Sequence, residues 1–307
     1  MKNSNNIDFK SQLNSFIDFL RFERYLSKNT IDSYQRDLLL FNSYLEEQKI
    51  HFLDITHENI INFLENLYKN YTESSISRIL SSLRVFYKFL LREEVITFNP
   101  FSQIKNPKKP IKIVQVLDAD EVKKFLDSIP HATALQLRDK AMFELLYSSG
   151  MRVSEIVNLR LNDIDYEDRI IRCIGKGNKE RLIPIGETSL YYLKAYINSA
   201  RSKIHKSNKK TKSNDFVFLN KNGQKITRQG FWKILKKYEK KFNFEKNIYP
   251  HLFRHSYATH MLQNGADLRL VQELLGHCNI STTEVYTNIN KKFIKESFVK
   301  NHPRNKN

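Results

Sequence analysis

Glycine and proline are scarce in this chain, with 8 and 7 copies in 307 residues. Turn-rich all-β architectures need many of both, so the scarcity disfavours them and favours a mainly helical fold. Hydrophobic residues make up 40% of the chain and aromatic residues 12%, which is enough to bury a core and excludes wholesale disorder. At this length, two domains are a better expectation than one.

Cysteines and long apolar runs are also nearly absent. The two cysteines, Cys173 and Cys278, cannot make a disulfide framework. No apolar run approaches the roughly 18 residues that a membrane span needs, and residues 1–9 lack the basic start and apolar stretch of a signal peptide. The sequence therefore predicts a cytoplasmic protein without membrane insertion.

Acidic residues are outnumbered, because 51 Lys and Arg face 33 Asp and Glu and leave a net charge of +18. Residues 1–108 carry 14 basic and 13 acidic side chains, whereas residues 109–307 carry 37 and 20. Residues 201–246 alone contribute a net +12. This balance indicates a polyanionic partner, with nucleic acid the leading candidate, although a merely soluble basic protein could share it.

A segment rich in proline and lysine separates the two halves of the chain. Its composition suits an extended linker, so we expect one domain over 1–98, a linker over 99–112 and a second domain over 113–307. Apolar spacing predicts four helices in the first domain, the third capped by Thr56 and the fourth running from about Glu73 to Leu91. The outer face of the fourth helix carries Arg78, Arg84 and Lys88, which suit DNA phosphates as well as a solvated face.

The second half alternates helix and hairpin patterns. Gly150 suits a left-handed helix stop, and Arg152 stands at the start of the next helix, where it can grip an anion or pair with Glu155. Alternating apolar residues over 170–174 and 181–185 predict a β-hairpin with Lys176 near its tip. A basic helix around residues 231–237 favours a surface that contacts a nucleic-acid backbone, or a solvated face.

Residues 249–260 are the most informative segment. Pro250 suits the first turn of a helix, and the spacing places His251 and Arg254 on one face, with Leu252, His255 and Thr259 on an inward one. Zinc is disfavoured here, because the residue after His251 is not the glutamate that the zincin pattern requires.

Five ordered motifs together resemble the catalytic signature of the tyrosine recombinases. They are residues 150–155 (GMRVSE), 175–181 (GKGNKER), 251–255 (HLFRH), 275–277 (LGH) and 285–287 (VYT). Residues 26–38 resemble the amino-terminal domain of the bacterial Xer branch, and residues 302–304 resemble its carboxy-terminal tail. Cys278 and Met151 depart from the family's commoner serine and leucine, and neither change affects the expected catalysis.

The resemblance implies attack on a DNA phosphodiester by a tyrosine hydroxyl, a 3′-phosphotyrosyl intermediate, and no metal, ATP or other cofactor. It makes Tyr286 the nucleophile, Arg152 and Arg254 the phosphate clamp, and Lys176 the general acid. His251 would assist proton transfer and His277 would bind the phosphate, with Glu155 supporting the site. We expect DNA contacts from Arg78, Arg84, Lys88, Lys179, Arg181, Lys233 and Lys236.

The family also implies a mainly α fold, in which a small four-helix SAM-like domain and a larger helical catalytic domain with a short β-sheet close around DNA as a C-shaped clamp. Its members act as homo- or hetero-tetramers on a short dyad site, exchange a C-terminal helix, and in the Xer branch resolve chromosome or plasmid dimers at dif-like sites with a septal DNA translocase of the FtsK type. The alternatives are an integrase of a mobile element, a type IB topoisomerase, and a DNA-binding protein on this fold that no longer cuts.

Overall fold

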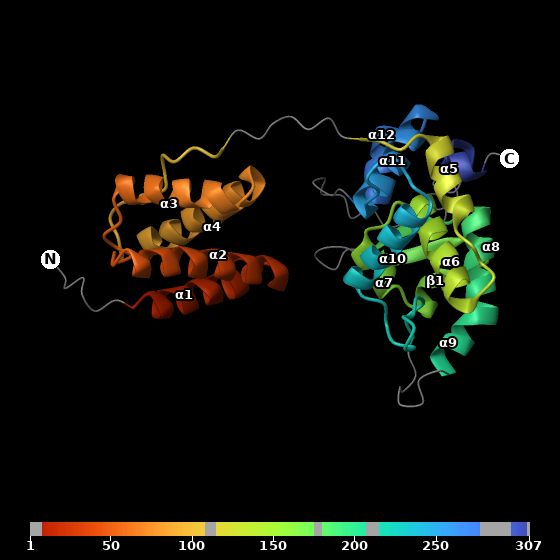
Figure 1. The fold of residues 1–307 in the computed structure, drawn as a ribbon, viewed down its shortest axis with the longest axis horizontal. Coiled ribbons are helices and arrows are strands. Elements are labelled where there is room, and N and C mark those ends of the chain that lie inside the picture. Colours follow the sequence, from red (N-terminus) through yellow and green to blue (C-terminus); the bar gives the residue numbers. More distant parts are fainter. Residues whose placement is uncertain (1–7, 108–114, 175–179, 207–214, 277–295, 306–307) are drawn as a thin grey trace. The chain divides into compact units, whose positions relative to one another are not determined.

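The computed structural model describes residues 8–107, 115–174, 180–206, 215–276 and 296–305. The chain divides into two compact units, Met1–Ile113 and Val114–Asn307. Each unit has its own buried apolar core. Figure 1 labels the main helices of both units.

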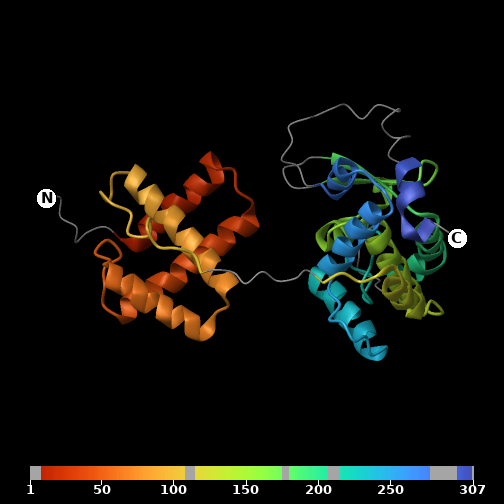
Figure 2. The same cartoon turned by 90° about the horizontal axis from the view of Figure 1, so that it is seen from above.

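The first unit consists of four main helices, as the apolar spacing predicts. They are α1 (Phe9–Asp18), which continues as the π-helical turn η2 (Phe19–Glu23), α2 (Lys28–Glu47), α3 (His57–Asn70) and α4 (Glu73–Arg92). The predicted cap is confirmed, because the Thr56 hydroxyl accepts a hydrogen bond from the backbone of Asn59. Helix α4 packs against the other three, which cross around it (Figure 2).

Two arginines of α4 are used inside this unit. Arg78 forms an ion pair with the buried carboxylate of Asp37 on α2. Arg84 donates hydrogen bonds to the carbonyls of Phe101 and Ile104, at 3.3 and 2.9 Å, and so holds the chain that follows α4 against the helix. Phe101 is fully buried in the core, and part of the segment expected as linker is therefore packed on the first unit.

The second unit is built around α6, whose residues from Arg138 onward are all buried. Its helices are α5 (Ala119–Ser128), α6 (Ala134–Ser149), α7 (Val153–Asn158), η3 (Leu161–Asp163), α8 (Glu187–Ala195), η4 (Tyr196–Arg201), α9 (Ser202–Lys206), α10 (Arg228–Lys241), α11 (Pro250–Gln263), α12 (Leu268–Leu275) and η5 (Pro303–Asn305). Helices α5, α7, α8 and α11 pack around α6, which places the starts of α7 and α11 within one core.

The predicted β-hairpin is confirmed as part of a three-stranded antiparallel sheet. Strands β1 (Ile164–Asp165), β2 (Ile170–Ile174) and β3 (Glu180–Pro184) are neighbours in that order. In the β2–β3 register, Cys173 is opposite Arg181 and Ile171 is opposite Ile183. Strand β3 also packs against α12, so the hairpin joins the sheet to the helix that precedes residue 277.

The C-terminal segment packs on its own chain. Residues 296–301 are helical, and Phe298 is buried in the core of the second unit. The His302 ring is fully buried beside Tyr147, and the Arg304 guanidinium pairs with Glu144 at 2.6 Å. The described end of the chain is thus bound to α6 of the same subunit.

Candidate functional site

Arg152 lies in the turn between α6 and α7, where the chain changes direction. Gly150 ends α6 with φ of 57°, which confirms the predicted left-handed stop. An added Cβ at Gly150 would lie 2.5 Å from the ring of Tyr257, so the turn is pressed against α11. Arg152 is the N-cap of α7, and its side chain remains one-third exposed.

Glu155 holds Arg152 in this place. One carboxylate oxygen accepts the Arg152 backbone N–H at 2.7 Å and the other accepts the guanidinium at 3.0 Å. Burial alone would raise the pKa of Glu155, but hydrogen bonds and charge from Arg181, with further help from Arg152, bring this pKa below its usual value. Glu155 is therefore ionised at neutral pH and fixes the direction of Arg152.

Arg254 approaches the same place from α11. Its guanidinium donates to the Gly150 carbonyl at 2.6 Å and to the Leu275 carbonyl at the end of α12. The residue is buried, and burial together with the like charge of Arg152 lowers the pKa of Arg254 to about 10. With this pKa, the Arg254 guanidinium still carries its charge at neutral pH.

Arg152 and Arg254 bring two positive charges near each other. Their like charges repel each other, and the single carboxylate of Glu155 is shared between Arg152 and Arg181. A phosphodiester with two non-bridging oxygens can accept planar donors from both guanidiniums. The geometry thus supports the binding of a phosphate and the stabilisation of charge that develops on it.

Of the other expected catalytic residues, the structure describes His251 alone. His251 lies in the first turn of α11, one turn before Arg254, and is exposed. Lys176, His277 and Tyr286 lie outside the described residues. His255 is exposed, which corrects its expected inward place, whereas Leu252 is buried as expected and Thr259 is half-buried.

The structure places Arg181, one of the expected DNA contacts, inside the protein. Arg181 is buried, and its guanidinium donates to both carboxylate oxygens of Glu155 at 2.9 and 2.8 Å. The sequence contained the signal for this, because Arg181, Ile183 and Ile185 recur with period two and therefore share the inward face of a strand.

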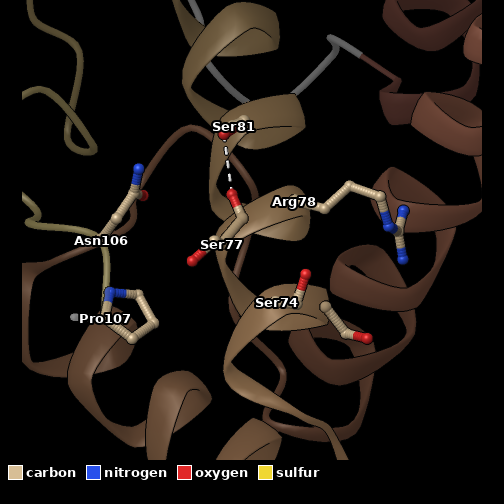
Figure 3. A pocket seen from close by; sticks show the side chains of 7 residues that line it. Ser74, Ser77, Arg78, Ser81, Asn106 and Pro107 are labelled. Atoms are coloured by element: carbon tan, nitrogen blue, oxygen red, sulfur yellow. Dashed lines mark hydrogen bonds between the residues drawn. The ribbon is translucent and has the colours of Figure 1, made fainter. Parts of the chain in front are cut away.

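The exposed face of α4 carries a polar pocket of about 620 Å³ (Figure 3). Figure 3 shows Ser74, Ser77 and Ser81 on α4 opposite Asn106 and Pro107. The Ser77 hydroxyl is buried and has no hydrogen-bond partner within the described part of the chain. Hydroxyl and amide groups of this kind can donate hydrogen bonds to phosphate oxygens.

The other expected DNA contacts have three outcomes: some are exposed, some are bonded within the protein, and one lies outside the described residues. Lys88 on α4 and Lys233 on α10 are exposed, whereas Lys236 pairs with Glu239 at 2.6 Å. Arg78 is half-exposed and pairs with Asp37, and Arg84 is held by backbone carbonyls. Lys179 lies outside the described residues.

Within the described ranges, no cluster of three or more His, Cys, Asp or Glu side chains is arranged to hold a metal ion. Cys173 is a buried free thiol whose pKa burial raises to about 12. None of the described helices has the length and hydropathy to span a membrane.

Comparison with known proteins identifies the family of this chain. Residues 115–292 match the phage integrase family, and residues 13–94 match the phage integrase N-terminal SAM-like domain. The chain belongs to the phage integrase family. Arg152 and Arg254 lie within the first match, and the serines of the pocket on α4 lie within the second.

The similarity extends over almost the whole chain. Tyrosine recombinase XerD of Oceanobacillus iheyensis is 44% identical over 295 residues, which cover 95% of this chain and 98% of that relative. XerD of Listeria innocua is also 44% identical with the same coverage. This identity places the family member in the Xer branch of the tyrosine recombinases.

Two solved structures share the fold. The XerH site-specific recombinase bound to difH substrate matches with a TM-score of 0.69 and 21% identity, covering 97% of this chain and 83% of that one. A lambda integrase tetramer bound to a Holliday junction matches with a TM-score of 0.67 and 19% identity, covering 94% and 82%. The expected fold class, a SAM-like helical domain with a helical catalytic domain and a short sheet, is confirmed.

Proposed function

We propose that this protein is a site-specific DNA recombinase that cuts and rejoins strands through a 3′-phosphotyrosyl intermediate. The observation that carries the proposal is the convergence of Arg152 and Arg254 at the junction of α6, α11 and α12, with Glu155 orienting the first arginine. Membership of the Xer branch supplies the reaction that such a phosphate site would serve.

In the proposed reaction, the Tyr286 hydroxyl attacks the phosphorus and loses its proton with help from His251. The bond to the 5′ oxygen breaks, and Lys176 protonates this leaving group. Arg152, Arg254 and His277 would bind the non-bridging oxygens, where negative charge grows in the transition state. Attack by a 5′-hydroxyl on the phosphotyrosine then rejoins a strand, and the number of phosphodiester bonds is conserved without ATP.

The proposed substrate is double-stranded DNA with a short dyad site of the dif type, on which the two units would close as a clamp. We infer assembly as a homo- or hetero-tetramer, cytoplasmic action on chromosome or plasmid dimers, and stimulation by a septal DNA translocase of the FtsK type. The relatives named XerD and the XerH structure with difH substrate support the choice of site.

The test uses a nicked suicide substrate, from which the fragment that carries the 5′-hydroxyl diffuses away after cleavage. The wild-type chain should become covalently joined to DNA in a denaturing gel, whereas Tyr286→Phe should form no adduct because it lacks the attacking oxygen. Tyr191→Phe is the matched control, since Tyr191 is two-thirds exposed on α8. Covalent trapping by Tyr286→Phe would show that another residue is the nucleophile.

A further inference from the structure

Arg181 connects three parts of the catalytic unit, although its side chain is only 7% exposed. Its Nη1 and Nη2 atoms donate to Oε1 and Oε2 of Glu155, and its Nε donates to the Leu274 carbonyl at 3.0 Å. Strand β3, the N-terminal end of α7 and the C-terminal end of α12 therefore meet at one guanidinium.

We propose that Arg181 is a positioning residue for strand cleavage, which holds Glu155 and the end of α12 in the one arrangement that leaves Arg152 available to a phosphate. The proposal rests on the recombinase function proposed above. It concerns a residue that touches neither DNA nor the reacting atoms and acts through Glu155 and through the backbone of α12.

The first consequence of the contact concerns Glu155. A carboxylate next to two arginines can pair fully with either one, and a bidentate pair with Arg152 would occupy the donors that a phosphate needs. Arg181 binds both oxygens of Glu155, and the Arg152 side chain donates only one hydrogen bond to it. Arg152 is thereby oriented, and the rest of its guanidinium stays available.

The second consequence concerns the end of α12. The carbonyl of Leu274 accepts from Arg181, and that of Leu275 accepts from Arg254. The next residue, Gly276, has φ of 66°, and an added Cβ there would lie 3.1 Å from Nη1 of Arg181. The guanidinium thus packs directly on the turn from which the chain continues to residue 277, and a single arrangement of α12 serves both arginines.

The cleavage test compares Arg181→Gln and Arg181→Lys with Arg172→Gln, an exposed arginine on neighbouring β2. At saturating protein, we expect both Arg181 variants to form the covalent adduct about 10- to 100-fold more slowly, because lysine cannot bind both oxygens of Glu155. Their affinity for site DNA should match that of the wild type, and Arg172→Gln should cleave normally. Normal cleavage by Arg181→Gln, or a loss confined to affinity, would overturn the proposal.

A second substrate separates this role from one at the leaving group. Replacing the bridging 5′ oxygen by sulfur gives a leaving group that needs no proton donor. The Arg181→Gln defect should persist on this substrate, because it arises at the phosphate clamp. Recovery of the wild-type rate would instead place the effect of Arg181 on protonation of the leaving group and would refute the proposed route.

A measurement without DNA keeps the two proposals distinguishable. Hydrogen–deuterium exchange should become faster in the peptide covering residues 270–276 of Arg181→Gln and stay unchanged in α10. Unchanged exchange at the end of α12, or faster exchange throughout the second unit, would contradict a local positioning role. If the wild type formed no adduct while this local effect was present, the recombinase function would fail and the positioning contact would stand.

Discussion

At the scale of single residues, the second unit uses arginine in two ways. Arg152 keeps one-third of its side chain exposed, whereas Arg181 and Arg254 are buried and use their donors on protein carbonyls and on Glu155. Burial of a guanidinium costs free energy unless its donors are satisfied. Arg181 and Arg254 are therefore held rigidly, and in the proposed reaction Arg254 binds the phosphate together with Arg152 through donors that the two carbonyls do not use.

Gly150 gives a prediction about this frame. Alanine at Gly150 would adopt φ near 57° and place its Cβ 2.5 Å from Cδ1 of Tyr257. The backbone conformation costs about 1 kcal/mol, and the contact with the ring adds about 1–3 kcal/mol. We expect Gly150→Ala to lower the free energy of unfolding by the sum of these effects, measured by urea denaturation.

Gly265→Ala is the control for this prediction, because Gly265 also has a positive φ, of 92°, but the nearest atom to an added Cβ is 4.0 Å away. It should show the backbone cost alone. Equal losses of unfolding free energy in the two variants would mean that the contact between the Gly150 turn and Tyr257 does not affect stability.

At the scale of elements, the C-terminal segment is attached to α6 by one buried ring and one ion pair. His302 lies against Tyr147, Tyr257 and Phe298. Burial lowers the pKa of His302 to about 3, helped by the nearby charge of Arg304 and by His260. The docked segment therefore carries a neutral imidazole, and Glu144 is paired with Arg304 rather than with His302.

The attachment should weaken in mild acid. The folded pKa of His302 lies below its unfolded value of about 6.5, so the unfolded chain binds a proton first and stability falls as pH drops below that value. Between pH 7.5 and 5, this group should cost about 2 kcal/mol of unfolding free energy in the second unit. Urea titrations should show a correspondingly flatter pH profile for His302→Phe, and His131→Phe, at an exposed histidine, should keep the wild-type slope.

At the scale of the whole molecule, the charge of +18 is concentrated in the second half of the sequence. Part of that charge is internally paired, as Lys236 with Glu239 and Arg181 with Glu155 demonstrate. Net charge therefore overstates the number of cations that can meet phosphates. In the described part of the chain, Lys88 and Lys233 are exposed lysines for which we propose contacts with DNA phosphates.

Salt dependence can count these contacts. The logarithm of DNA affinity should fall linearly with the logarithm of salt concentration, by about 0.9 for each phosphate contact. Lys233→Gln should reduce this slope by about 1, whereas Arg181→Gln should leave it unchanged. Fluorescence anisotropy at several salt concentrations measures both. A reduced slope for Arg181→Gln would return that arginine to the DNA-contacting set.

Much of the architecture was predictable from local sequence. The cap at Thr56, the stop at Gly150, the proline at the start of α11 and the β2–β3 hairpin depend on neighbours within a few residues. The burial of Arg181 was harder to predict, because its charge favours an exposed position whereas its place in the strand register favours a buried one. His255 was misplaced because α11 is buried around most of its circumference, so helical spacing did not identify a single inward face.

The sequence by itself determined the family, the helical fold class and the order of the motifs, because these depend on residue type and spacing along the chain. Only the tertiary structure decided that Arg181 serves Glu155, that Arg254 binds the ends of α6 and α12, and that the C-terminal segment packs on α6. Those contacts join residues from 21 to 160 positions apart. A hydrogen bond over such a separation depends on how the helices pack, and local propensity carries no information about it.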